Sequence, residues 1–406
     1  MRKRRVVVTG MGAVSPYGVG LAAMTEALKE ERCGISVLAE NQRIPGIECC
    51  LAGLVPPIPN LKQIPRELRR TMSPMSIYAL LAAKEALAQA GLDENDLPRM
   101  GVCIGSTMGS GQELNSLFAE YIPSNSLDAV RTMAFFKIMS HTASSSLAIA
   151  LGLTGRLINP TAACAAGLQG IGMAYEAIAF GREDRMLCGG AEEYSPLTTA
   201  TFDKIGAASH ALDPMLSSRP FDKRRDGIVC SEGAGVLLLE EKEAAEARGA
   251  RIIAEIAGFA TLSSAHGVAQ PSEDATAECM KAALEDAGML AQDIRYINAH
   301  ATATLAGDVA ESRAIASVFG DSVPVSSLKG PMGHAMAASG ALEAIACADM
   351  IGQGYLVGCR SDIEPDPECG KITLAKSEKT WRPGPVVKNS FALGGVYASL
   401  VLCPVC

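Results

Sequence analysis

The sequence has 406 residues, enough for two or three average domains or for one large double unit. Its formal net charge of −8 argues against nucleic acid as a partner, because binding phosphates requires a broad basic surface. The first residues do not resemble a signal peptide, and no apolar stretch approaches the roughly 20 residues that cross a bilayer. Thirteen cysteines without framework spacing indicate free thiols. We therefore expect a soluble protein of the reducing cytoplasm, without a membrane partner.

The N-terminal quarter alternates between strand and helix patterns. The apolar run 6–10 predicts a buried first strand that ends in a turn. Helices are predicted over 21–30 and 76–90, the second ending at Gly91. A second apolar strand over 101–105 is followed by a loop of small residues. This alternation predicts an α/β protein with a largely parallel sheet.

A sequence pattern around residue 90 recurs 197 residues later. The run from Ala86 to Leu97 matches the run from Ala283 to Ile294, and an apolar strand pattern follows each copy. A constant offset close to half the chain indicates an internal duplication. We predict two similar α/β halves, residues 1–250 and 251–406, with the boundary where a charged helix over 241–248 ends at Gly249.

Cys164 is the best candidate for a nucleophile. It lies among small residues, after an extended stretch and before a helical pattern over 168–179. A position near a helix N-terminus favours the thiolate and lowers the pKa of a thiol. An isolated cysteine is more often a small core residue, so the assignment depends on its partners.

Two of the five histidines are candidate partners. His300 and His334 both stand in loops that follow apolar strand patterns. Such loops carry the functional groups of many α/β sheets. Either histidine alone would more often be structural, but together with a reactive thiol they form a plausible catalytic set.

The motifs around these three residues resemble the signatures of β-ketoacyl synthases, the thiolase-fold condensing enzymes of fatty acid and polyketide synthesis. The resemblance extends from Val6 to the C-terminal strand. It implies a thiolase-like fold, in which two duplicated α/β halves form α-β-α-β-α layers. Further matching blocks are Cys188-Gly-Gly-Ala-Glu192, Arg219-Pro-Phe-Asp222, Arg225-Asp-Gly227 and Asn389-Ser-Phe391.

The resemblance also implies the reaction and the roles of its residues. An acyl group is transferred to Cys164, a malonyl thioester is decarboxylated, and the two are joined into a 3-oxoacyl thioester on acyl carrier protein. His300 and His334 donate hydrogen bonds to the enolate oxygen, supported by Lys329 in a pair with Glu343. The backbone N–H groups of Cys164 and Leu393 hold the tetrahedral oxyanion.

The same resemblance implies how substrate is bound. Thr302 and Thr304 match residues that hydrogen-bond the phosphopantetheine arm, which arrives on the carrier protein, so no cofactor is expected on the chain itself. Met108 and Phe202 match residues of the acyl pocket, and Leu393 matches the gate at its mouth.

Partner surfaces are implied as well. A basic run in this acidic chain matches the region of the family that meets the acidic carrier protein: Lys62, Arg66, Arg69 and Arg70. The family also implies a homodimer, or a heterodimer with a ketosynthase-like subunit. In either dimer the segment 156–163 pairs with its counterpart across two sheet edges.

The gate departs from the family pattern. The chain reads Ala392-Leu393-Gly-Gly-Val-Tyr397, whereas the family usually shows Gly-Phe-Gly-Gly-Thr-Asn. Leucine in place of the gatekeeping phenylalanine removes an aromatic lid. We interpret this change as favouring a specialised pathway, such as polyketide or polyene synthesis, over housekeeping elongation.

Two other functions are kept open. A thiolase-like acyltransferase working on coenzyme A thioesters would use a second cysteine, where this chain has histidines. A non-catalytic partner subunit resembling a chain-length factor would typically lack the nucleophile that Cys164 supplies.

Two further motifs are discounted. Gly10-x-Gly12-x-x-Ser15 resembles a dinucleotide fingerprint but lacks the third glycine. Cys403 and Cys406 have the spacing of metal ligands, but no second pair stands nearby in the sequence. No metal site is therefore expected.

Overall fold

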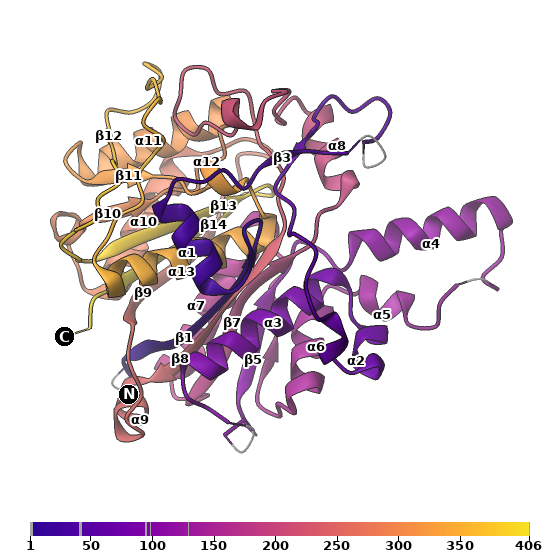
Figure 1. Cartoon of the computed structure of the whole chain (residues 1–406). Helices are drawn as coiled ribbons and strands as arrows, with labels where there is room; N and C mark the ends of the chain where they lie inside the picture. The colour runs from indigo at the N-terminus through magenta and orange to yellow at the C-terminus, as the bar shows by residue number, and fades with distance from the viewer. Residues whose placement is uncertain (1–2, 40–42, 94–95, 98, 129, 406) are drawn as a thin grey trace.

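A computed structural model describes residues 3–39, 43–93, 96–97, 99–128 and 130–405 (Figure 1). A mixed β-sheet runs through this part of the chain, and helices cover both of its faces. Its main strands, in spatial order from one edge to the other, are β12 (Thr373–Leu374), β11 (Pro324–Ser326), β10 (Tyr296–Asn298), β13 (Val386–Ala392), β14 (Val396–Cys403), β9 (Ala254–Ser263), β1 (Val6–Ser15), β8 (Gly233–Glu241), β7 (Arg185–Glu192), β5 (Gly101–Gly105) and β6 (Leu157–Ile158).

The two sides of this sheet repeat one pattern. From β1 outward, two antiparallel pairings lead through β8 to β7, and two parallel pairings lead through β5 to β6. From β9 outward, β14, β13, β10 and β11 follow with the same sequence of pairings. Residues 6–8 pair with 254–256 and join the two sides. This repetition agrees with the internal duplication, while the limits of the halves, 1–250 and 251–406, stay a prediction.

Helices complete five layers, as the sequence predicted. Two helices lie between the two sides of the sheet and contact strands of both, α7 (Ala166–Ala179) and α13 (Met336–Gln353). The outer face of the N-terminal side is covered by α3 (Pro74–Gln89) and α6 (Thr142–Leu151). The outer face of the C-terminal side is covered by α10 (Glu273–Ala287) and α11 (Leu305–Phe319). The α/β class is confirmed, but the prediction of a largely parallel sheet is wrong, because the five consecutive pairings from β13 to β7 are antiparallel.

The first strand is longer than predicted. β1 continues from Val6 to Ser15 instead of ending in a turn at Gly10, and all ten of its residues are buried. A Cβ atom on Gly10 or Gly12 would lie 2.0 Å from a carbonyl oxygen of α3. These glycines therefore let a helix lie close on the strand. The segment that resembled a dinucleotide fingerprint, residues 10–15, is part of this continuous strand.

The shorter elements lie around this frame. In Figure 1, α4 (Gly111–Ser124) extends away from the body of the molecule. No helix in the described part of the chain is both long and apolar enough to span a bilayer. The remaining helices are α1 (Leu21–Lys29), α2 (Arg66–Thr71), α5 (Ala134–Ile138), α8 (Pro196–Lys204), α9 (Lys242–Ala247) and α12 (Lys329–Met332), and the remaining strands are β2 (Gly18–Val19), β3 (Ser36–Val37) and β4 (Leu51–Ala52).

Candidate active site

Cys164 stands at a sharp turn between strand and helix. The chain leaves β6 and adopts a left-handed conformation at Ala163, with φ of 46°. A short 3-10 helix over Ala163–Ala165 then leads directly into α7. Left-handed backbone at a residue other than glycine is costly and tends to occur at functional sites. The turn holds the Cys164 side chain in the interior, where the residue is 6% exposed.

Close packing of the central helices brings α13 to this turn. A Cβ atom on Gly167 would lie 2.1 Å from the carbonyl oxygen of Ala337, and one on Gly190 would lie 2.4 Å from the same oxygen. Only glycine, which has no Cβ atom, lets the backbone of another helix come this close. Because α13 begins just after His334, this packing carries that histidine to the nucleophile.

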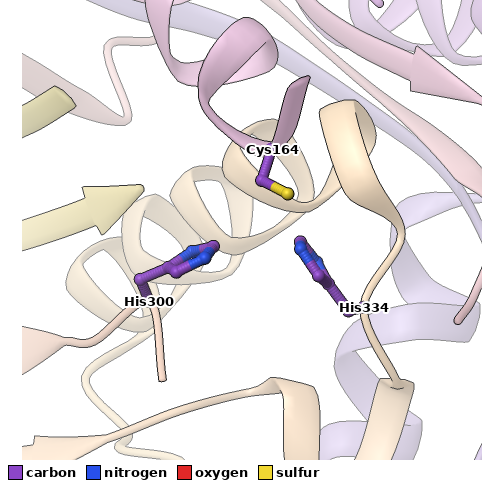
Figure 2. Close-up of side chains that lie close together, drawn as sticks. All are labelled: Cys164, His300 and His334. Carbon is purple, nitrogen blue, oxygen red and sulfur yellow. The ribbon is translucent and has the colours of Figure 1, made fainter. Parts of the chain in front are cut away.

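The three predicted reactive residues lie together. One ring nitrogen of His300, one of His334 and the Sγ atom of Cys164 are all within 4.8 Å of one another. The two imidazole rings meet edge to face, with their centroids 5.3 Å apart. Figure 2 shows both rings directed toward the sulfur, from loops on the C-terminal side of the sheet. The duplicated sides thus contribute the thiol and the imidazoles separately.

Each histidine has a ring nitrogen left over for a ligand. His334 Nδ1 lies 2.9 Å from Ser339 Oγ, whereas His334 Nε2 is buried without a partner. His300 Nδ1 is likewise buried and unpartnered. Buried polar atoms nearly always have a hydrogen-bond partner, so exceptions at a cavity wall indicate groups that await a ligand.

Both imidazoles are held neutral. Burial lowers the pKa of His300 and of His334 well below the ordinary value for histidine, and the nearby ammonium groups of Lys329 and Lys388 lower it further. A neutral imidazole can donate one hydrogen bond and accept another. These side chains are therefore suited to hydrogen bonding with an oxygen or a proton acceptor, and not to forming ion pairs.

The expected lowering of the Cys164 pKa is not seen. Burial raises the pKa of this thiol to about 12, and the carboxyl of Glu192 raises it too, while the Lys329 ammonium opposes both. Desolvation disfavours the charged thiolate more than the helix N-terminus favours it. At neutral pH the cysteine therefore carries its proton, and a base must accept that proton when the sulfur reacts.

Lys329 and Glu343 form the predicted pair, and a second lysine joins them. Lys329 Nζ lies 2.6 Å from one carboxylate oxygen of Glu343, and Lys388 Nζ lies 2.7 Å from the other. All three residues are at most 1% exposed. Sequence analysis missed Lys388, although a lysine inside the apolar strand 386–391 was a visible signal.

A second buried carboxylate holds the His300 loop. Glu311 accepts hydrogen bonds from the backbone N–H groups of His300 and Ala301, at 2.8 and 2.7 Å. It also accepts one from the side chain of Asn389 at 3.2 Å. Sequence analysis missed Glu311. The available signal was its position three residues after Asp308 on α11, which places both carboxylates on one helical face.

A cavity of about 400 Å³ opens at these groups. Cys164, His300 and His334 form its inner end, and Phe202 lies in its wall. The hydroxyls of Thr302 and Thr304 are 3.2 Å apart and also line it. Leu393 belongs to the lining, and 37% of its surface is exposed.

Two groups of predicted residues are not found at this cavity. Met108 is half-buried and is not part of the cavity wall. The expected carrier-docking residues lie on or beside α2, which packs on α6, and none of them lines the cavity: Lys62, Arg66, Arg69 and Arg70. Of the two C-terminal cysteines considered as metal ligands, Cys406 lies outside the described residues.

Comparison with known families decides what this arrangement belongs to. The family "Beta-ketoacyl synthase, N-terminal domain" matches residues 3–245, and "Beta-ketoacyl synthase, C-terminal domain" matches residues 253–361. The chain belongs to the β-ketoacyl synthase family. Its fold is accordingly the thiolase-like fold expected from the motifs, and its enzyme class is that of the acyltransferases.

Relatives match over nearly the whole chain. The 3-oxoacyl-[acyl-carrier-protein] synthase 2 of Vibrio cholerae is 39% identical over 412 residues, 99% of each chain. Nodulation protein E of Rhizobium meliloti is 34% identical over 404 residues, 98% of each chain.

Solved structures agree with these relatives. A beta-ketoacyl synthase from Burkholderia phymatum has a TM-score of 0.94 at 39% identity, covering 99% of this chain and all of that one. The ishigamide ketosynthase/chain length factor has a TM-score of 0.91 at 33% identity, with full coverage of both chains. A chain in the solved structure of a type II PKS acyl-carrier protein in complex with its ketosynthase has a TM-score of 0.88 at 30% identity, also with full coverage of both chains.

Proposed function

We propose that this β-ketoacyl synthase elongates acyl chains held on an acyl carrier protein, with Cys164 as acyl acceptor and His300 and His334 as the groups that stabilise the malonyl-derived enolate. The observation that carries the proposal is the meeting of one thiol and two imidazoles, within 4.8 Å, at the inner end of a cavity. The 39% identity to a 3-oxoacyl-[acyl-carrier-protein] synthase 2 supports the substrate class.

In the first step the sulfur of Cys164 attacks the carbonyl carbon of the incoming acyl thioester. The thiol is protonated at neutral pH, because its pKa is raised to about 12. A neutral imidazole accepts that proton and passes it to the departing pantetheine sulfur. The backbone N–H groups of Cys164 and Leu393 are the proposed donors to the oxyanion, and both residues line the cavity.

In the second step a malonyl thioester loses CO₂. Electrons of the broken carbon–carbon bond form an enolate, whose oxygen accepts hydrogen bonds from the two unpartnered ring nitrogens. We propose that the Ser339 hydroxyl donates to His334 Nδ1, 2.9 Å away, which places the imidazole proton on Nε2. The enolate carbon then attacks the acyl carbon, and the bond to Cys164 sulfur breaks as the 3-oxoacyl product forms.

Lys329 and Glu343 act behind the histidines. Burial lowers the pKa of Lys329, and its contact with the Glu343 carboxylate opposes this change. We propose that the pair orients His300 and His334 and keeps them neutral. The pair needs no contact with substrate to do so.

The carrier protein is the proposed source of both substrates. Thr302 and Thr304 line the cavity where they could hydrogen-bond a phosphopantetheine arm, and Phe202 would contact the acyl chain. The solved complex of a type II PKS acyl-carrier protein with its ketosynthase supports such a partner. For Lys62, Arg66, Arg69 and Arg70, exposed or half-exposed positions on and beside α2 are compatible with docking.

A dimer is the proposed assembly. β6 forms one edge of the sheet, and Leu157 in this strand is 46% exposed. Pairing of this edge with a second subunit would cover unpaired backbone groups and apolar side chains. The similarity to a ketosynthase/chain length factor supports a heterodimer as well as a homodimer. Light scattering of the purified chain at micromolar concentration should give the mass of two chains. A monomer would contradict the homodimer, and a chain that also stays monomeric when a ketosynthase-like subunit is added would contradict the heterodimer.

No bound cofactor or metal is proposed, since the chemistry described above uses only side chains, backbone N–H groups and the thioesters themselves. Condensing activity should therefore survive treatment with a chelator and desalting. We further propose the cytoplasm as the site of action, in line with thirteen cysteines that lack the spacing of a disulfide framework.

The experiment that tests the function supplies a purified acyl carrier protein loaded with acyl or malonyl groups. We expect formation of a 3-oxoacyl product two carbons longer, detected by mass spectrometry of the carrier. Thiolytic cleavage of acetoacetyl-coenzyme A, without condensation from malonyl thioesters, would instead support the thiolase-like alternative. Activity that appears only when a second ketosynthase supplies the nucleophile would support the non-catalytic subunit.

A further inference from the structure

Lys388 is a fully buried lysine that the proposed chemistry does not use. It lies on β13, between Val387 and Asn389, and is 0% exposed. An ammonium group in such a place requires compensation, because removing it from water costs several kcal/mol (roughly 5) in real proteins. Its surroundings therefore show what it is held for.

The compensation comes from the residues around the histidines. Lys388 Nζ lies 2.7 Å from Glu343 Oε2, while Lys329 Nζ lies 2.6 Å from Glu343 Oε1. The carboxylate is thus held at both oxygens by ammonium groups from two different elements. Lys388 Nζ also donates to the backbone carbonyl of Asn389.

β13, the strand that carries Lys388, also connects to the His300 loop. The Asn389 side chain donates to Glu311 at 3.2 Å, and Glu311 accepts from the backbone N–H of His300 at 2.8 Å. Lys388 and Asn389 therefore stand between the Lys329–Glu343 pair and the carboxylate that fixes the His300 loop. One continuous set of polar contacts thus runs from Lys329 to the His300 loop.

The charges of these residues disfavour protonation of the two histidines. The titratable groups that contact Lys388 or interact with its charge come from several elements around it. They are Lys329 on α12, Glu343 and Cys347 on α13, Glu311 on α11, and His300 and His334 in their loops. The Glu343 carboxylate is shared between two lysines, so the second ammonium adds positive potential behind the imidazoles.

We propose that Lys388 is a positioning residue for the condensing reaction: it clamps the second oxygen of Glu343 and supplies a second buried positive charge that keeps both histidines neutral hydrogen-bond donors. This inference rests on the proposed function. The Lys388 ammonium lowers the pKa of His300 and of His334, after burial and after Lys329. Removing the charge should therefore raise both pKa values and protonate the imidazoles at a higher pH.

The test compares Lys388→Met, which keeps length but removes the charge, with Lys388→Arg, which keeps the charge. The readout is the rate of malonyl-carrier decarboxylation from pH 4 to 9, a range that starts low because the pKa values of both imidazoles lie well below the ordinary histidine value. For Lys388→Met we expect the acid limb to move to higher pH by about one unit, so that the rate relative to pH 8 falls about tenfold on that limb. For Lys388→Arg the limb should stay at the wild-type position.

A merely structural lysine would give another result. If Lys388→Met lowers the rate by one factor at every pH, with its acid limb unmoved, the inference is wrong. Lys388→Gln, which keeps a polar side chain without the charge, replaces the methionine variant if that variant fails to fold. An inactive wild-type enzyme would count against the proposed function, whereas an active wild type with an unmoved limb in the neutral variants would count only against Lys388.

Discussion

At the scale of single residues, the site holds reactive groups that are uncharged at rest. Burial raises the pKa of Cys164 to about 12 and lowers the pKa of both histidines. These shifts favour a neutral thiol beside neutral imidazoles over a preformed thiolate–imidazolium pair. We therefore expect Cys164 to react slowly with simple electrophiles at neutral pH.

This resting state predicts how Cys164 reacts with a simple alkylating agent. Without substrate, the rate of iodoacetamide modification at Cys164 should keep rising from pH 6 to pH 9.5, because the thiolate fraction grows about tenfold per unit below the pKa. Peptide mapping by mass spectrometry at each pH gives the rate. A plateau reached near pH 7 would show that the thiol is acidic, as its place before a helix first indicated.

Removal of one histidine should separate the two steps of the reaction. His334→Ala deletes an unpartnered ring nitrogen that would donate to the enolate. We expect malonyl decarboxylation to fall about 10²- to 10³-fold, the usual effect of losing one oxyanion donor. His300 remains as the base, so acylation of Cys164 should fall much less. Equal losses in both steps, measured by single-turnover acylation and by CO₂ release, would contradict this division.

The gate offers a residue-scale test of specificity. Tyr397 lines the same cavity, where it is buried, packs on Phe391 and accepts a hydrogen bond at 3.0 Å from the Ser272 N–H, so these contacts hold it in the wall. Leu393 stays partly exposed at the cavity. Leu393→Phe should therefore narrow the range of acyl chains accepted, above all long or unsaturated ones, and leave malonyl decarboxylation near the wild-type rate. Competition assays with mixed acyl carriers measure that range, and an unchanged product distribution would make Leu393 a neutral replacement.

Sequence reasoning located reactive residues better than it located their supports. Cys164, His300 and His334 stand in motifs of small and polar residues that few structural roles require. Glu311 and Lys388 are common residue types in an ordinary helix and strand, and only the tertiary structure shows that they are buried. The prediction of a lowered pKa for the Cys164 thiol was wrong for the same reason, since desolvation depends on residues that are far away in the sequence.

At the scale of secondary-structure elements, the nucleophile depends on glycines that let α7 and α13 touch. Four helices were predicted with ends that lie within two residues of those observed: 21–30, 76–90, 168–179 and 241–248 correspond to α1, α3, α7 and α9. The first strand was predicted too short because Gly10 and Gly12 suggested a turn. They serve instead as contact points for α3, which no local pattern reveals.

This packing makes Gly167 a sensitive position. In Gly167→Ala the new methyl group would lie 2.1 Å from the Ala337 carbonyl oxygen, so α7 and α13 must separate. We expect a loss of about 1–3 kcal/mol in stability, together with reduced condensing activity at temperatures where the protein is still folded. Chemical denaturation and steady-state assays test both effects. Gly352→Ala, on α13, is a control for the loss of a glycine without steric overlap, because a Cβ there would meet its nearest neighbour, Ile253, at an ordinary contact distance of 3.4 Å.

At the scale of the whole molecule, the duplication explains why the site exists where it does. The thiol comes from the N-terminal side of the sheet, and both imidazoles come from loops on the C-terminal side. The repeat in the sequence predicted two similar halves, but the pairing of residues 6–8 with 254–256 that joins them could not be read from a local pattern. The residues predicted to dock the carrier protein lie away from the cavity of their own chain, which no local pattern could predict either: Lys62, Arg66, Arg69 and Arg70.

The most direct test of the account follows the acyl group itself. The enzyme is incubated with an acyl carrier protein that bears an isotopically labelled acyl chain, and its peptides are then mapped by mass spectrometry. We expect the label on Cys164 alone, with discharge on addition of malonyl carrier protein, and no 3-oxoacyl product from a folded Cys164→Ala variant. Label on another thiol, such as the neighbouring Cys230, or condensation at a near wild-type rate by Cys164→Ala, would contradict the central claim.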